Sequence, residues 1–180
     1  MNELEGLLKK TSDLYNSSLQ SILPPMVVAA LELSRTYHLE VHSKFALSSQ
    51  EEIALFSGAQ KMIETVASLA RGQGMYAESS ELYYNTGSIL SALETAEEGG
   101  LTKRREGLCL EYVVFLAQHG SGSEFAKLKF GDDKKTLLGL VKTVAKKTDS
   151  STAYSFGVNC GLEAESLIPI LGEDDFCASV

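Results

Sequence analysis

Apolar residues recur at steps of three and four residues along most of this chain, a spacing that places them on one face of an α-helix. The pattern is clearest after Asp133, an acidic residue of the kind that often begins a helix. The apolar positions there are Leu137, Leu138, Val141, Val144 and Ala145. Another side of the same segment carries Lys135, Lys142 and Lys146. The segment is therefore predicted to be an amphipathic helix with a basic side.

A second helix is predicted to begin in the run Thr148-Asp149-Ser150-Ser151, whose side chains can accept a hydrogen bond from a free backbone N–H. Its expected inward face comprises Ala153, Phe156, Gly157, Cys160 and Ala164. Each of these two helices has a narrow apolar stripe, so both must bury their stripes against each other and against further helices. Such an arrangement is typical of stacked helical repeats.

Start and stop signals divide the rest of the chain into further helices. The expected helices cover residues 3–22, 26–42, 49–71, 79–98 and 103–118, with 124–130 as a short helix or a strand. The strongest start signal is a pair of overlapping Ser-x-x-Glu capping boxes at Ser48 and Ser49. Residues 110–117 are rich in β-branched and aromatic side chains, but their apolar positions fit the helical step, so helix is preferred. The acidic tail 171–176 is expected to fray.

The length of 180 residues suffices for one domain with a sizeable core, and no linker-like composition divides the chain. We therefore predict a single all-α domain over residues 1–180. Its expected form is a short right-handed solenoid of armadillo or HEAT type, either complete or a piece of a longer solenoid.

Composition narrows the classes of partner and compartment. A formal net charge of −8 disfavours binding to nucleic acid or to an anionic membrane surface, because both would repel the protein. The N-terminus lacks the basic start and apolar run of a signal peptide, and the longest apolar run, 26–31, is too short to cross a bilayer. The 3 cysteines have no Cys-x-x-Cys spacing, which indicates neither a disulfide framework nor a zinc ribbon. We expect a cytoplasmic protein.

Two groups of residues resemble chemical sites, and both are more typical of ordinary structure. His38 and His42 share a helix face that suits zinc, but Glu40 does not follow the first histidine directly and no third ligand is indicated. Cys160 lies among small residues, yet nothing brings a base such as His119 to it. A cysteine in an apolar stripe usually packs in a core. We therefore predict no catalytic residue, no metal site and no cofactor.

A series of short motifs runs through residues 105–164. They are Arg105-Glu106-Gly107-Leu108, Glu111-Tyr112, Phe125-Ala126-Lys127, Leu137-Leu138-Gly139-Leu140-Val141, Asp149-Ser150-Ser151 and Tyr154-Ser155-Phe156-Gly157-Val158-Asn159-Cys160. In this order they resemble armadillo repeats of the UCS family of myosin-directed chaperones, in which an EGL-x-YL helix leads to an LxxL helix and then to a YG…VN helix. The resemblance implies a myosin motor domain as client, held in a folding-competent state without nucleotide hydrolysis by this chain.

The resulting hypothesis is a protein-binding helical-repeat module that is not an enzyme. The basic middle of the chain is expected to dock an acidic partner, and tyrosine is a favoured contact residue at interfaces. The predicted partner-binding residues are Lys135, Lys142, Lys146, Tyr154 and Asn159. Two alternatives stay open, a helical adaptor unrelated to myosin and a small cysteine- or metal-dependent enzyme. A metal bound in stoichiometric amount or a thiol of depressed pKa would favour the enzyme.

Overall fold

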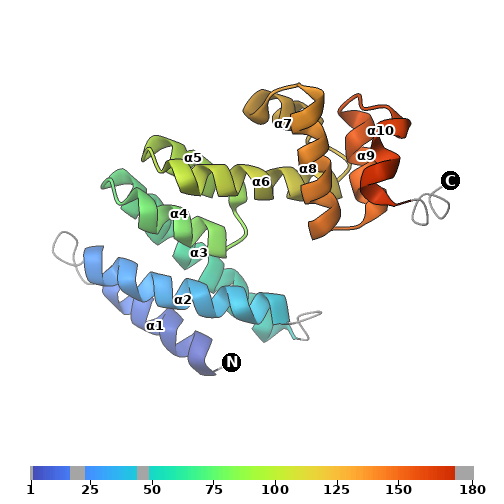
Figure 1. Ribbon diagram of the computed structural model, residues 1–180. Helices are drawn as coiled ribbons and strands as arrows, with labels where there is room; N and C mark the ends of the chain where they lie inside the picture. The colour runs from blue at the N-terminus through green and yellow to red at the C-terminus, as the bar shows by residue number, and fades with distance from the viewer. Residues whose placement is uncertain (1, 17–22, 44–48, 173–180) are drawn as a thin grey trace. The chain divides into compact units, whose positions relative to one another are not determined.

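The structure is a computed structural model in which residues 2–16, 23–43 and 49–172 are described. These residues form ten α-helices, and no strand occurs among them. In chain order (Figure 1) the helices are α1 (Asn2–Asn16), α2 (Leu23–Ser43), α3 (Gln50–Gly72), α4 (Tyr76–Asn85), α5 (Ile89–Glu98), α6 (Thr102–Gln118), α7 (Ser123–Phe130), α8 (Lys134–Lys147), α9 (Ser150–Asn159) and α10 (Ala164–Leu171). The all-α prediction is confirmed, and the armadillo- or HEAT-like solenoid stays a prediction.

The contacts between residues divide the chain into two compact units, Met1–Arg105 and Glu106–Val180. The boundary falls within α6. A single domain over residues 1–180 stays a prediction. Helix is confirmed over residues 110–117, and residues 124–130 are helical rather than extended.

The core of the first unit is centred on α3. Its buried residues are Phe56, Ala59, Ile63, Val66, Ala67 and Ala70. Half of these are alanines, and small side chains at a helix contact allow the neighbouring helices to approach closely. Both α2 and α4 pack against α3, and Leu33 of α2 and Leu82 of α4 are fully buried. Figure 1 shows α1 beside α2, and α1 also contacts α3.

Buried hydroxyl groups join the helices of the first unit. Ser79 Oγ donates to Ala67 O at 2.8 Å, which ties α4 to α3. Ser80 Oγ donates to Ala92 O at 2.9 Å in α5 and accepts from Arg104 Nε at 3.0 Å. Each hydroxyl is therefore satisfied inside the core, where a group without a partner would be costly.

A common turn ends successive helices of the first unit. Gly74, Gly87 and Gly100, thirteen residues apart, have φ of 76°, 82° and 65°, a left-handed conformation that glycine adopts without strain. In each turn the N–H of the residue after the glycine bonds back into the helix, as from Ser88 to Tyr83 O at 2.9 Å. This pattern is the Schellman motif. Only three residues separate α3 from α4, and only three separate α4 from α5.

The prediction of one helix over residues 79–98 is wrong. The structure has two helices, α4 and α5, separated by Thr86-Gly87-Ser88. The predicted start at residue 79 is also wrong, because α4 begins at Tyr76, and Ser79 and Ser80 lie in its buried interior. The Schellman turn at Gly87 supplies the physical reason, because its hydrogen bonds replace those that would continue the helix.

Several helix starts are as predicted. Ser49 caps α3 by accepting from Glu52 N at 3.1 Å, as the capping box requires. Asp133 caps α8 and Asp149 caps α9 by accepting from Thr136 N and Thr152 N. Ser48, residues 17–22 of the first predicted helix and residues 173–176 of the acidic tail lie outside the described part of the chain.

The second unit encloses its own core between α6, α7, α8, α9 and α10. Its fully or nearly fully buried members include Val113, Val141, Val144, Phe156 and Leu167. The expected inward face of the segment after Asp149 is correct for Ala153, Phe156, Gly157 and Cys160, all of which are buried. It is wrong for Ala164, which is exposed because Gly161 ends α9 and Ala164 begins the separate helix α10.

No helix among the described residues is both long enough and apolar enough to cross a membrane.

Candidate functional site

Three of the predicted binding residues form a row on α8. Lys135, Lys142 and Lys146 are separated by seven and four residues, and all are exposed. The buried side of α8 consists of Leu137, Leu140, Val141 and Val144, so these lysines point away from the core. At about 1.5 Å per residue the row extends roughly 16 Å along the helix. We call Lys135, Lys142 and Lys146 the lysine row.

The charges of α8 are unusual for an acidic protein. The helix KKTLLGLVKTVAKK contains five lysines and no carboxylate. Lys146 and Lys147 in its last turn suit the helix dipole, but Lys134 and Lys135 stand at its positive end, where a cation is unfavourable. Asp133 offsets part of this cost as the N-cap, and its hydrogen bonds from Thr136 lower the pKa of its carboxyl group. Helix stability alone does not account for these two lysines.

The lysine row is available to a partner. Neither Lys142 nor Lys146 makes an ion pair with any residue that the structure describes. On an adjacent side of α8, Lys147 Nζ lies 3.9 Å from Glu111 Oε1 of α6. Lys142 and Lys146 therefore combine exposure with unpaired charge, whereas the charge of Lys135 is close enough to Asp133 to help lower the pKa of that carboxyl group.

Tyr154 and Asn159, the other two predicted binding residues, do not extend the row. Tyr154 in α9 is half-buried and packs against the core of the second unit. Asn159 is exposed and is the last residue of α9. The two lie five residues apart on different sides of that helix, so the structure does not bring them together as one contact surface.

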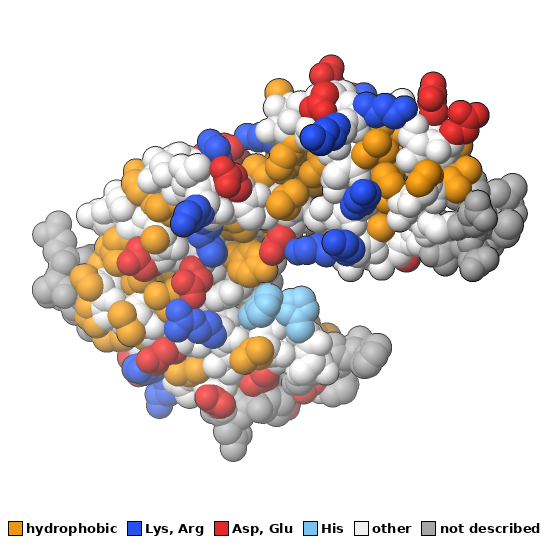
Figure 2. Space-filling model, in the orientation of Figure 1, with side chains coloured by type: hydrophobic (Ala, Val, Ile, Leu, Met, Phe, Trp, Pro, Cys, Tyr) orange, Lys and Arg blue, Asp and Glu red, His pale blue; other side chains and the backbone are white. Residues whose placement is uncertain are grey.

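An aromatic cluster missed by the sequence reasoning joins α6 and α7. The rings of Tyr112 and Phe125 meet edge to face with centroids 4.9 Å apart, and Phe115 lies 6.2 Å from Tyr112. Phe115 is exposed, and Leu128 of α7 is 80% exposed. In Figure 2, hydrophobic side chains are visible on the surface between the charged side chains. The second unit thus offers apolar as well as basic contacts.

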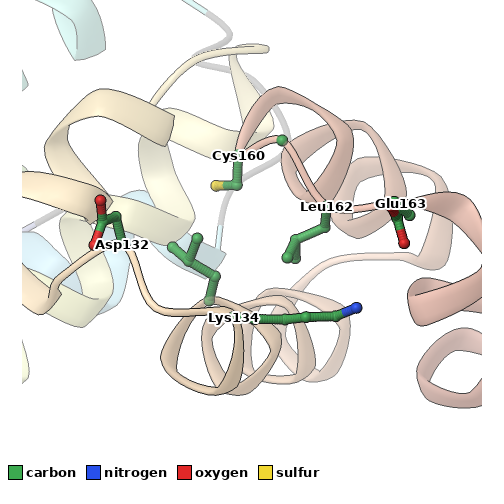
Figure 3. A pocket seen from close by; sticks show the side chains of 7 residues that line it. Asp132, Lys134, Cys160, Leu162 and Glu163 are labelled. Atoms are coloured by element: carbon green, nitrogen blue, oxygen red, sulfur yellow. The ribbon is translucent and has the colours of Figure 1, made fainter.

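A small pocket opens between α8 and the loops that precede α8 and α10. Its volume is about 220 Å³, and Asp132, Lys134, Leu137, Cys160, Gly161, Leu162 and Glu163 line it. Figure 3 shows the Cys160 thiol and the Leu162 side chain directed into this space, with Asp132 at one edge. The described residues contain no group of three or more histidine, cysteine, aspartate or glutamate side chains placed to hold a metal ion.

The pocket thiol is not activated for nucleophilic chemistry. Cys160 is only 4% exposed, and burial raises the pKa of its thiol, an effect that the nearby charge of Lys127 partly opposes. A nucleophilic cysteine requires the opposite shift, toward the thiolate at neutral pH. His119 instead places its Nδ1 2.7 Å from Phe115 O within α6. Burial therefore disfavours the thiolate form of Cys160.

Comparison of the chain with protein-family models, curated proteins and solved structures finds no match.

Proposed function

We propose that this chain is a protein-binding helical-repeat module of the cytoplasm, built as a short right-handed solenoid of armadillo or HEAT type. Its lysine row docks an acidic segment of a client protein, and the chain carries out no chemistry on that client. The observation that supports this most directly is the exposed row of Lys135, Lys142 and Lys146 on a helix that has five lysines and no carboxylate.

Exposed lysines mainly set the rate and the choice of partner. Their long-range field steers an acidic surface toward α8, whereas each solvated ion pair adds little free energy of binding. Most of the affinity must therefore come from apolar contacts. Phe115 and Leu128 of the same unit are exposed hydrophobic side chains suited to that role.

The proposed client is a myosin motor domain. This choice rests on the resemblance of residues 105–164 to UCS-family armadillo repeats, and the row supplies a physical means of contact. Such a client would be held in a folding-competent state by surface contact, with no nucleotide hydrolysis by this chain.

The test is direct binding of the purified chain to a purified myosin motor domain, measured by isothermal titration calorimetry in low salt. The variant Lys135→Glu/Lys142→Glu/Lys146→Glu removes the row. The matched control, Lys9→Glu/Lys61→Glu/Lys103→Glu, makes the same change in net charge at three exposed lysines of the first unit. We expect the first variant to weaken binding at least about tenfold and the control to keep most of the affinity.

Equal losses of affinity in the two variants would show that binding depends only on net charge. The lysine row would then not be the binding site. Absence of binding by the unaltered chain would remove myosin as the client. Circular dichroism of both variants verifies that each retains its helices.

A further inference from the structure

The aromatic cluster on α6 and α7, formed by Tyr112, Phe115 and Phe125, continues at one end to His119. The centroid of the His119 ring lies 4.5 Å from that of the Phe115 ring. The Nδ1–H group of His119 donates to Phe115 O at 2.7 Å, and this hydrogen bond fixes the direction of the imidazole ring. Four rings from two helices therefore form one continuous surface.

The inner part of this surface is anchored and its outer part is exposed. Tyr112 and Phe125 are half-buried and contact each other between the two helices, which holds both rings in place. Phe115 is 42% exposed, and His119 beside it is exposed as well. An aromatic side chain that stays largely in water adds little to the stability of its own fold, but it gains free energy when a partner covers it. Phe115 is thus held in position for a contact with a partner.

Lysines from two further segments adjoin the aromatic cluster. Lys129 Nζ lies 5.9 Å from the centre of the Phe125 ring. Lys147 of α8 reaches Glu111, which lies one helical turn before Phe115 on α6. The last turn of α8 also carries Lys146, so the lysine row ends in a turn that contacts α6 next to the aromatic cluster.

The local charge favours an acidic ligand over a basic one. Residues 123–147 contain seven lysines and three carboxylates. Nucleic-acid bases also stack on aromatic rings, but a long polyphosphate chain would extend over the rest of a protein whose formal net charge is −8. A short acidic protein segment occupies only the basic region. The combination of exposed rings and nearby lysines therefore fits a segment that is both aromatic and acidic.

We propose that the aromatic cluster receives one aromatic side chain of an acidic protein segment, which packs on Phe115 while carboxylates of the same segment lie near Lys146 at the end of the lysine row. This inference rests on the proposed function for its acidic client, and it adds the kind of side chain that supplies most of the affinity. An aromatic anchor fits better than an aliphatic one, because aromatic rings in offset or edge-to-face contact gain more than their buried area alone provides.

The probes are three synthetic glutamate-rich peptides of equal length and charge, with tryptophan, leucine or alanine at the central position. This chain contains no tryptophan, so indole fluorescence reports the peptide alone. We expect the emission of the tryptophan peptide to shift to shorter wavelength on binding in low salt, as the indole ring leaves water. In competition with it, the leucine peptide should bind at least about threefold more weakly and the alanine peptide at least about tenfold more weakly.

Phe115→Ala should weaken binding of the tryptophan peptide at least about tenfold and leave that of the alanine peptide unchanged. The matched control is Leu90→Ala, which removes a 45% exposed apolar side chain from α5 and should change none of the three affinities. Circular dichroism verifies that both variants keep their helices. The variant Lys135→Glu/Lys142→Glu/Lys146→Glu should weaken the binding of all three peptides.

The outcomes separate this inference from the proposed function. If the triple lysine variant loses peptide binding and Phe115→Ala does not, the aromatic cluster is not the site, although the lysine row still is. If the tryptophan peptide depends on Phe115 but the chain binds no myosin motor domain, the aromatic site is supported and only the proposed client is removed. Absence of an emission shift, or equal affinities for the tryptophan and leucine peptides, would overturn the inference.

Discussion

Gly157 of α9 lies against Leu167 of α10 so closely that a Cβ atom at position 157 would stand 2.7 Å from Leu167 Cδ2. The same Cβ would lie 3.3 Å from Val141 Cγ2 of α8. Leu167 and Val141 are fully buried, so neither has free space into which to move. Three helices of the second unit therefore meet at a point where only glycine fits.

Gly157→Ala is expected to destabilise the protein by about 1–3 kcal/mol, the usual cost of forcing an extra carbon into a packed core. Gly139 is the matched control, because a Cβ added there meets no atom within 4 Å. Gly139→Ala should instead stabilise α8 by up to about 1 kcal/mol, since alanine is the better helix former. Urea unfolding of both variants measures the difference. A Gly157→Ala variant as stable as the unaltered chain would show that α10 is able to shift away from α9.

Asp149 is expected to make part of the stability pH-dependent. Its carboxylate accepts from Thr152 N at 2.8 Å and from Thr152 Oγ1 at 2.7 Å, and these hydrogen bonds lower the pKa of the carboxyl group. A carboxyl group with a lowered pKa in the folded state stabilises fully above its unfolded pKa, near 4, and loses this contribution as the pH falls through the folded value.

The measurement is urea unfolding at pH 7 and pH 3 for the unaltered chain and for Asp149→Asn. Asparagine still caps a helix but does not titrate, so the variant should lose less stability on acidification. Asp149→Ala lacks the cap and should have a lower Tm at pH 7. The same loss on acidification in all three proteins would contradict this assignment.

The adjacent serines Ser79 and Ser80 are expected to differ in importance. Both are fully buried, but only Ser80 also accepts a hydrogen bond from Arg104. Arg104 Nη2 is itself buried without a hydrogen-bond partner. The hydrogen bond from Nε to Ser80 therefore offsets part of the cost of burying the guanidinium group. Ser80→Ala should therefore cost about 1–2 kcal/mol more than Ser79→Ala, because it leaves a further charged donor without an acceptor.

A double-mutant cycle with Arg104→Met separates the two effects. Once the guanidinium group is gone, the additional cost of Ser80→Ala should shrink toward that of Ser79→Ala. An unchanged cost would show that the bond to Arg104 contributes nothing to stability.

The buried thiols are expected to react slowly in the folded protein. Cys109 and Cys160 are both buried, and burial raises the pKa of the Cys160 thiol. Alkylation of Cys160 by iodoacetamide at pH 8 should be at least about tenfold slower in the folded chain than in urea. Peptide mapping by mass spectrometry reports each cysteine separately. Alkylation at equal rates in both states would identify Cys160 as exposed or activated.

Much of the local structure could be predicted because it depends on nearby residues. The start of α8 follows from Asp133 and the start of α9 from Asp149, since a cap needs only a side chain and a backbone N–H within three residues. The outward position of the lysine row also follows from spacing alone. These features require no knowledge of distant parts of the chain.

The features that were missed have different causes, one local and the others dependent on packing between separate segments. The break between α4 and α5 was missed because the apolar residues keep the helical step across Gly87, and a lone glycine is tolerated within a helical pattern. Whether Tyr154 is a contact residue stays a prediction, because its half-burial depends on packing within the second unit, which periodicity does not report. The pocket likewise combines Asp132 and Cys160 from separate segments, so no single stretch of sequence indicates it.

The turns at Gly74, Gly87 and Gly100 constrain how this part of the chain can change in length. Each turn consists of three residues and is closed by backbone hydrogen bonds, so it cannot absorb an additional residue without breaking them. A residue inserted within α4 or α5 would therefore rotate the rest of that helix by about 100° and carry Leu82 or Leu93 out of the core. Insertion or deletion of thirteen residues at once would keep the main buried positions in register, because Ser79, Ser80 and Leu82 are buried and so are the residues thirteen positions later, Ala92, Leu93 and Thr95. Lengthening or shortening here is consequently expected in whole steps of one helix and its turn.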